Sequence, residues 1–347
     1  MRRSNLTTLV IGVFTMLLGI SALASPPEGG YHLYRKVPLG ATEAGGDYFD
    51  YIYFDGISRR VYVARGTEID VLDADTYALL GKITGLKRGH GVAIVPELNR
   101  GFISDGQAAQ AVIFDLKTLK TIGHVKAEPD ADSIIYDPVS KHIFTFNGDA
   151  NNATVIDPAT GTVVATAPLG GKPEQAVSDG MGMIYNCLED KNEVIAIDSR
   201  TLQIKARWPV TPAGAPVSIA MDREHRRLFV SGRNPAMMVV MNADNGKIIG
   251  PAFPIGGRVD TNIFDPVTGL TASSTGEGTI DIIHEDSPDK FSAVQTVITE
   301  YGAKTMALDP KTHNLLVDTS DFEPAVPTGA RWRRAKPGTF HLLIYGR

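Results

Sequence analysis

The hydrophobic and polar positions of this chain repeat a unit of short apolar strands separated by turn residues. One apolar strand ends at a turn containing Asp or Pro, a second strand follows, and this pair of signals returns every 41 to 44 residues. Asp accepts hydrogen bonds from nearby backbone, Pro fixes φ, and Gly adopts positive φ, so these residues favour turns. The turn anchors are Asp55-Gly56, Pro96-Glu97, Asp137-Pro138, Asp179-Gly180, Asp222-Arg223, Asp265-Pro266 and Asp309-Pro310.

A second anchor lies further along each unit, where a strand that is apolar at consecutive positions ends in a polar residue. It comprises Val71-Leu72-Asp73, Ile113-Phe114-Asp115, Val155-Ile156-Asp157, Ala196-Ile197-Asp198, Val240-Met241-Asn242 and Ile282-Ile283-His284. Each unit is predicted to hold four strands, which in the first unit span 51–54, 60–64, 68–72 and 78–83. Four short strands per unit of this length are typical of a propeller blade. The sequence therefore predicts an all-β, seven-bladed β-propeller with four-stranded antiparallel blades.

The last unit is expected to borrow a strand from the other end of the chain. Its predicted strands, 304–308, 314–317 and 340–345, leave the fourth position empty, whereas an unassigned strand spans 31–40. That strand ends in Val-Pro-Leu-Gly, which matches Ala-Pro-Leu-Gly at 167–170 in the third unit. We therefore expect the N-terminal strand to close the last blade as its outer edge, which removes an exposed sheet end.

The first 24 residues have the pattern of a secretory signal peptide. Arg2 and Arg3 precede an apolar run over 9–23, and Ala22-Leu23-Ala24 is a typical cleavage site. We therefore expect cleavage after Ala24, a mature propeller over 25–347 as a single domain, and a periplasmic or secreted location. No other segment is apolar enough to cross a membrane.

Composition narrows the classes of partner. The net charge of −5 disfavours a protein that binds nucleic-acid phosphates. The single cysteine, Cys187, excludes an intramolecular disulfide. We expect a monomer that binds a small molecule or an envelope protein.

The repeats resemble those of the YVTN-repeat, YncE-like seven-bladed β-propellers of exported bacterial proteins. The matching features are the Asp-Pro or Asp-Gly turn before an apolar strand, the apolar-apolar-Asp turn, and Pro-Leu-Gly-Gly at 168–171. The chain departs from the pattern in the sixth unit, where His284-Glu285-Asp286 replaces the usual turn, and in the seventh, where one connection is much longer. The resemblance implies a scaffold and no particular reaction. Some members are described as DNA-binding, which the net acidity argues against here.

Candidate site residues come from equivalent positions, five residues before each first turn. In a propeller these positions surround the mouth of the central channel. They are Asp50, Gly91, Asp132, Glu174, Val217, Asp260 and Lys304, with His90 beside Gly91. The carboxylates could hold a divalent cation such as calcium, or act as bases next to Lys304. The alternative is a solvated polar rim. His90 is either a ligand-contacting residue, because its flanking glycines allow close approach, or an ordinary loop histidine.

The connection over 318–338 is the clearest deviation from the repeat. It contains Asp321-Phe322-Glu323-Pro324 and then the basic cluster Arg331, Trp332, Arg333 and Arg334. Its length indicates a lid or a partner-contact loop whose arginines and Trp332 would bind an anionic group or a ring. The alternative is a flexible insertion whose arginines pair with nearby acids.

Two function classes remain. The first is a non-catalytic exported propeller that binds a ligand or protein on the face around the channel mouth. The second is a propeller enzyme of the lactonase, lyase or quinone-dependent dehydrogenase type, using a metal or an acid/base cluster there. The sequence contains no phosphate-binding loop, serine nucleophile elbow or haem-attachment motif.

Overall fold

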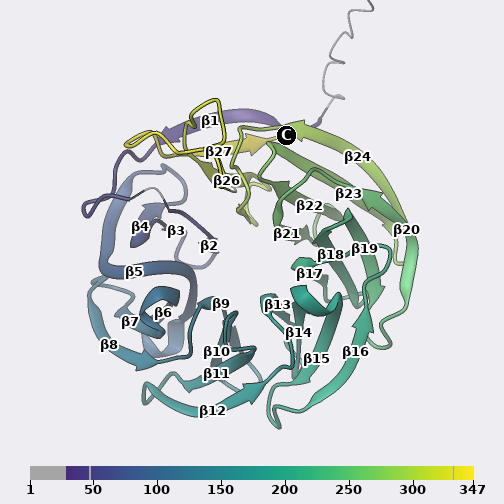
Figure 1. Cartoon of the computed structure of the whole chain (residues 1–347), viewed down its shortest axis with the longest axis horizontal. Coiled ribbons are helices and arrows are strands. Elements are labelled where there is room, and N and C mark those ends of the chain that lie inside the picture. Colours follow the sequence, from purple (N-terminus) through teal and green to yellow (C-terminus); the bar gives the residue numbers. More distant parts are fainter. Residues whose placement is uncertain (1–28, 47, 331) are drawn as a thin grey trace, which may run out of the picture.

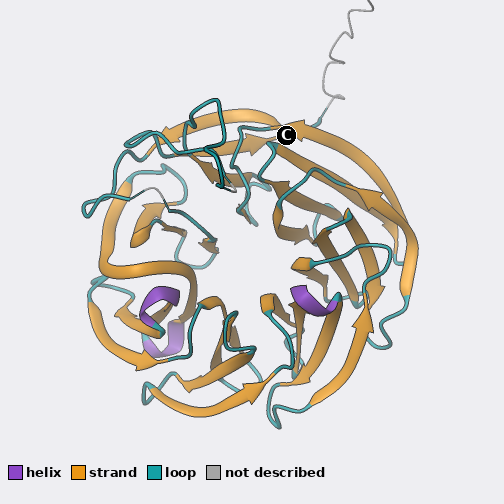
Figure 2. Cartoon of the chain, in the orientation of Figure 1, coloured by secondary structure: helices purple, strands orange, loops and turns teal. Residues whose placement is uncertain are grey.

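The computed structural model describes residues 29–46, 48–330 and 332–347. The predicted signal peptide and Arg331 lie outside these residues. The regular structure of the described residues is β-strand, apart from three short 3-10 helices (Figure 2). No helix among the described residues is long and apolar enough to span a membrane.

Hydrogen bonding groups the strands of the described residues into five four-stranded sheets and one seven-stranded sheet. The seven-stranded sheet contains β2 (Ile52–Asp55), β3 (Arg60–Ala64), β4 (Gly66–Asp73), β5 (Leu79–Val95), β6 (Arg100–Asp105), β7 (Gln110–Asp115) and β8 (Thr121–Lys126). The next sheet contains β9 (Ala131–Asp137), β10 (His142–Asn147), β11 (Asn152–Asp157) and β12 (Thr162–Pro168). It is followed by the sheet of β13 (Pro173–Ser178), β14 (Met183–Leu188), β15 (Glu193–Asp198) and β16 (Ile204–Pro209).

The remaining sheets continue around the same ring. One contains β17 (Pro216–Asp222), β18 (Arg227–Arg233), β19 (Ala236–Asn242) and β20 (Ile248–Pro254). Another contains β21 (Val259–Asp265), β22 (Leu270–Thr275), β23 (Thr279–Ser287) and β24 (Lys290–Ile298). The last contains β1 (His32–Pro38), β27 (His341–Gly346), β26 (Leu315–Thr319) and β25 (Met306–Leu308). The 3-10 helices are η1 (Pro96–Leu98), η2 (Gly106–Ala108) and η3 (Glu189–Lys191).

The sheets stand side by side around a common centre (Figure 1). Strands such as β9, β13, β17 and β21 lie nearest the centre, whereas β8, β12, β16, β20 and β24 lie at the periphery. This radial arrangement of antiparallel sheets is that of a β-propeller. It places the start of every inner strand at the same face of the molecule, which is what brings the candidate residues together.

Strand β5 differs from its prediction. It was expected to end at residue 83, but it continues to Val95 and is shared by two four-stranded sets. The extension exists because Gly89 pairs with Gly66 on one side and with Asp105 on the other. The described sheets thus confirm four-stranded antiparallel units, but they do not separate into seven individual sheets.

The N-terminal strand closes the ring as expected. Strand β1 pairs antiparallel with β27, with His32 opposite Gly346 and Pro38 opposite His341. Val37 is buried in a cluster that also holds Val63, Leu316 and Leu342, so the two ends of the chain share one core. Burying each large aliphatic side chain contributes about 1.5–3 kcal/mol, which makes this closure a substantial stabilising contact.

The aspartates of both anchors act as the turn chemistry predicts. Asp55 Oδ1 accepts the backbone N–H of Ile57 at 3.0 Å, and Asp309 Oδ1 accepts that of Lys311 at 2.9 Å. At the second anchor, Asp73 Oδ1 accepts the N–H groups of Asp75 and Thr76 at 3.1 and 2.8 Å. The repeat is therefore maintained by Asp side chains that satisfy the turn backbone.

Candidate functional site at the channel mouth

The six charged candidates all lie at the inner edge of the propeller. Asp50 precedes β2, His90 lies within β5, Asp132 in β9, Glu174 in β13, Asp260 in β21, and Lys304 precedes β25. Asp132 and Lys304 are half-buried, and the other four are buried. They are therefore not the solvated rim that was the alternative expectation.

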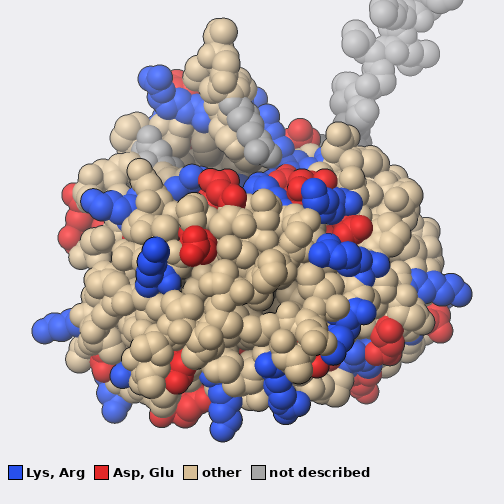
Figure 3. All heavy atoms as spheres, turned by 60° about the horizontal axis from the view of Figure 1, so that its bottom comes forward, with Lys and Arg blue, Asp and Glu red and all other residues tan. Residues whose placement is uncertain are grey.

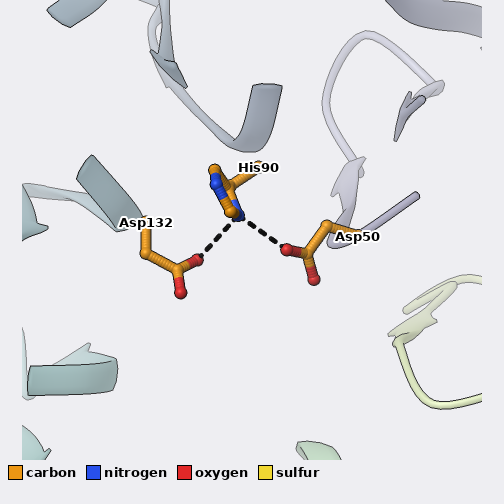
Figure 4. A group of neighbouring side chains, drawn as sticks. All are labelled: Asp50, His90 and Asp132. Atoms are coloured by element: carbon orange, nitrogen blue, oxygen red, sulfur yellow. Dashed lines mark hydrogen bonds and ion pairs between the residues drawn. The ribbon is translucent and has the colours of Figure 1, made fainter. Parts of the chain in front are cut away.

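His90 is the meeting point of two carboxylates. Its Nδ1 lies 2.7 Å from Asp50 Oδ2 and 3.2 Å from Asp132 Oδ1, so the two acids approach one ring nitrogen from opposite sides (Figure 4). Tyr48 Oη lies 2.9 Å from the same nitrogen and also donates to Asp50 Oδ2. Burial by itself would lower the pKa of His90, but the charges and hydrogen bonds of Asp132 and Asp50 outweigh it and raise the pKa to about 10. The imidazole is therefore a cation at neutral pH.

The loop before His90 is fixed by a buried aspartate. Asp105 Oδ1 accepts the backbone N–H groups of Lys87 and Arg88 at 3.1 and 2.7 Å. Gly106 lies against the imidazole, because a Cβ there would stand 2.7 Å from His90 Nε2. Only 2% of the His90 side chain is exposed, and Nε2 has no hydrogen-bond partner among the described residues. A Cβ at the flanking Gly89 would stand 2.6 Å from Leu86 Cδ1, and one at Gly91 would stand 3.1 Å from Ile134 Cγ2, so the flanking glycines accommodate close packing beside His90.

Lys304 connects this cluster to the opposite side of the channel mouth. Its Nζ donates to Asp50 Oδ1 at 2.9 Å and also to Asp260 Oδ2. Burial would lower the pKa of Lys304, but the charges of Asp260 and Asp50 outweigh it and raise the pKa well above its usual range. For Asp50, burial would raise the pKa, and Lys304 and His90 together lower it instead. Lys304, Asp50 and His90 therefore stay charged around neutral pH.

The ion pairs continue as a chain of alternating charge around the mouth. Asp260 also accepts a hydrogen bond from Arg233, and Arg233 lies 3.2 Å from Glu189. Lys172 lies 2.6 Å from Glu189 and 2.9 Å from Glu174. The chain runs through Asp132, His90, Asp50, Lys304, Asp260, Arg233, Glu189, Lys172 and Glu174. We call these residues the charge chain.

Both ends of the charge chain are acids. Burial raises the pKa of Glu174 to about 8, and the negative charge of Asp132 adds to this rise. The chain holds five acidic and four basic side chains, and the raised pKa of Glu174 reduces the excess of negative charge. The channel mouth is consequently near neutral, although sequence position alone suggested an acidic ring.

The donor set does not suit calcium. Donor atoms of Asp50, His90 and Asp132 all lie within 4.8 Å of one another, which is close enough for a shared ion. Calcium, however, takes six to eight oxygen ligands, and this cluster supplies one nitrogen and two carboxylates. One of those carboxylates, Asp50, is already paired with Lys304. Internal cations thus occupy the positions that the calcium hypothesis assigned to a metal.

The long connection folds back over the mouth as an ordered arm. Phe322 and Ala335 form an isolated bridge, and Glu323 N donates to Arg334 O at 2.8 Å. Tyr301 is the anchor beneath it, with its ring 5.0 Å from that of Phe322 and 6.0 Å from that of Trp332. We call residues 320–338, without the undescribed 331, the arm.

The arginines of the arm are not neutralised by acids of the described chain. The guanidinium of Arg333 lies 4.5 Å from the centre of the Tyr301 ring, a cation–π contact, and Arg334 is exposed. The guanidinium carbon of Arg258 lies 4.6 Å from the centre of the Trp332 ring. The indole also packs against Gly276, where a Cβ would stand only 2.5 Å away. The two described arginines thus lack acid partners, which favours the ligand- or partner-contact interpretation of the arm.

A pocket of about 430 Å³ lies between the arm and the charge chain. Its wall is mainly aromatic and basic, and Gly302 and Ala335 complete it. The aromatic residues are Tyr48, Phe49, Phe322 and Trp332, and the basic ones are Arg88, Lys304, Arg333 and Arg334. Arg88 lies 4.4 Å over the ring of Tyr48. On the face drawn in Figure 3, acidic and basic groups are interspersed.

Sequence reasoning missed several members of the site. Lys172, Glu189 and Arg233 belong to the charge chain but lie outside the positions counted from the first turn. A charged residue at the end of the second strand of a unit could have indicated two of them. Glu189 directly follows β14, and Arg233 is the last residue of β18. Tyr48 and Arg88 each lie two residues before a candidate, Asp50 and His90, and could have been found by widening the window.

Comparison with known proteins shows the fold and no more. No protein-family model matches the sequence, and no curated protein sequence matches it. Among solved structures, Kuenenia stuttgartiensis hydrazine synthase matches with a TM-score of 0.69 and 13% identity over 80% of this chain and 93% of that chain. U3-55K matches with a TM-score of 0.73 and 8% identity over 92% and 99%.

The WD40 repeats of RRP9 match with a TM-score of 0.74 and 9% identity over 93% of this chain and 98% of theirs. These likenesses confirm the predicted β-propeller. Their low identity transfers no activity.

Proposed function

We propose that this chain is an exported, seven-bladed β-propeller of the YVTN-repeat, YncE-like type that binds a small anionic, ring-bearing ligand. The pocket of about 430 Å³ between the arm and the charge chain carries the proposal. Its volume falls in the range of small-molecule sites, and its wall combines ring-stacking surfaces with basic groups. The proposed count of seven blades treats the seven-stranded sheet as two four-stranded units that share β5.

The charges of the pocket favour an anion over a neutral ligand. Lys304 is already shared between Asp50 and Asp260, so it adds little net charge. Arg333 and Arg334 have no ion pair to a carboxylate of the described chain, and they stand at the pocket wall. Guanidinium groups bind carboxylate and phosphate through paired hydrogen bonds, and Trp332 offers a ring face for stacking.

A single-tryptophan variant can test this binding. The chain has two tryptophans, Trp208 and Trp332, so Trp208→Phe makes Trp332 the sole reporter at the pocket. In that background we would titrate phenyl phosphate and benzoate, with neutral benzamide as the uncharged comparison. We expect the two anions to change Trp332 emission saturably and benzamide to do so only at much higher concentration.

Arginine variants assign the charge requirement. Arg333→Gln or Arg334→Gln should weaken phenyl phosphate binding about tenfold or more, because a charge-assisted hydrogen bond contributes about 1.5–3 kcal/mol. Arg200→Gln, an exposed arginine in the turn after β15, is the matched control and should leave binding unchanged. Equal binding by benzamide and phenyl phosphate, or no effect of the two arm arginines, would refute the proposal.

The enzyme alternative retains one supporting observation, the convergence of Asp50, His90 and Asp132 on one nitrogen. We favour binding because His90 is buried and neither it nor Asp132 lines the pocket. If His90 were an acid or base, His90→Gln would abolish turnover of a bound ester or lactone while leaving its binding intact. Our proposal predicts that the wild-type protein does not turn over such a compound.

A further inference from the structure

The sixth unit buries a glutamate where the repeat otherwise places small or apolar residues. Glu285 N donates to Gly269 O at 2.8 Å, the same backbone contact that Ala74 makes with Arg59 and Ala243 with Arg226. The residue after the second anchor is therefore Ala in two other units and Glu in this one. Only 4% of the Glu285 side chain is exposed. This is the place where the sequence departed from the repeat pattern.

The carboxylate of Glu285 lacks partners. Neither Oε1 nor Oε2 accepts a hydrogen bond from the described residues. Arg227 donates instead to Pro288 O, to His225 O at 2.7 Å and to Asp289 Oδ1 at 2.9 Å. A buried carboxylate without donors costs several kcal/mol unless a cation compensates it.

Two further metal-ligand side chains face the same point. His225 Nδ1 lies 2.6 Å from Asp222 Oδ2 and 3.1 Å from Glu285 Oε1. One donor atom from each of the three residues lies within 4.8 Å of the other two. Because Nδ1 carries at most one proton, it can make a good hydrogen bond to only one of the two acids, and its contact with Asp222 is the shorter one. The Glu285 carboxylate is left facing the cluster without a hydrogen-bond donor among the described residues.

We propose that Asp222, His225 and Glu285 bind a divalent transition-metal ion of the zinc or manganese type. Two carboxylates and a neutral imidazole carry a charge of −2, which one divalent ion neutralises. Imidazole with carboxylates is a ligand set that these ions take, unlike the oxygen-only set of calcium. The side chain of His225 is 42% exposed, so an ion can enter from solvent and keep water as a further ligand.

The site is separate from the proposed ligand pocket. Asp222 ends β17, whereas the candidate ring position of the same strand, Val217, lies near its start. The metal would thus join the β17 turn to β23 at the opposite end of the propeller, linking two neighbouring sheets. A protein that binds no metal at this site could therefore still bind the proposed ligand in the pocket beneath the arm.

The test is titration of the chelator-treated protein with Zn²⁺, Mn²⁺ and Ca²⁺, followed by native mass spectrometry and thermal unfolding. We expect one Zn²⁺ or Mn²⁺ per chain and a rise of Tm on binding, because ligands of the folded state stabilise it. Ca²⁺ should compete weakly. Absence of stoichiometric Zn²⁺ and Mn²⁺ binding would overturn the proposal.

Variants decide between this site and adventitious binding to surface histidines. Glu285→Ala installs the residue found at Ala74 and Ala243, so it should fold, and it should weaken Zn²⁺ binding about tenfold or more. His225→Ala should do the same. His313→Ala is the matched control, since His313 lies 2.8 Å from Asp265 and the described residues supply no third ligand there, and it should bind like wild type. Unchanged binding by Glu285→Ala and His225→Ala would show an adventitious ion only and refute the site.

Discussion

Lys304→Met removes the cation that two buried carboxylates share, and we expect it to lower the free energy of unfolding by about 3–5 kcal/mol. The Lys304 side chain is 16% exposed, and those of Asp50 and Asp260 are 7% and 10% exposed. Each lost charge-assisted hydrogen bond contributes about 1.5–3 kcal/mol. Asp50 keeps His90 and Asp260 keeps Arg233, so the loss is not expected to exceed this range. Methionine preserves most of the apolar stem, which makes the change mainly one of charge.

The assay is equilibrium unfolding in urea, which does not screen charges as guanidinium chloride does, followed by circular dichroism. Lys311→Met is the matched control, because Lys311 is 64% exposed and pairs with Asp75 at the surface. That variant should change stability by about 0–1 kcal/mol. A loss below about 1 kcal/mol for Lys304→Met, equal to the control, would refute the charge chain as a stabilising element.

Three further predictions concern Glu174, Gly276 and Val37. Glu174 has a folded pKa of about 8 against an ordinary 4.5, so the folded state holds an extra proton between these values and stability falls as pH rises through this window. Glu174→Gln should remove that slope, up to about 1.4 kcal/mol per pH unit, in urea unfolding at pH 5 to 8; an unchanged slope would contradict the burial argument. Gly276→Ala should displace Trp332 and weaken phenyl phosphate binding, which calorimetric titration would measure. Gly123→Ala is the control and should not weaken binding, because its Cβ would meet only ordinary contacts. Val37→Asp should open the β1–β27 closure and lower Tm by several degrees in a calorimetric scan, and an unaltered Tm would contradict the role of this contact.

The repeat was predictable because its signals are local. Asp55 and Asp73 satisfy backbone within their own turns, so periodic aspartates report periodic turns whatever the distant contacts are. The closing strand was also predictable, because its final residues repeat a pattern seen at 167–170. Strand β5 was not, since its extension depends on Gly89 pairing with two different neighbours.

The candidate site was predictable in position but not in electrostatics. Equivalent residues of successive units gather at one mouth by symmetry, which placed Asp50, Asp132 and Lys304 correctly. Their protonation and pairing depend on distances between side chains of different units, and the sequence contains no such distances. The acidic ring that was expected is therefore a nearly neutral chain, in which Arg233 and Lys172 supply the missing cations.

The measurement closest to the central proposal is a crystal structure of the protein with phenyl phosphate. We predict electron density in the pocket beneath the arm, with the phosphate against Arg333 and Arg334 and the ring on Trp332. Density only outside this pocket, or an empty pocket at a ligand concentration well above the measured Kd, would contradict it.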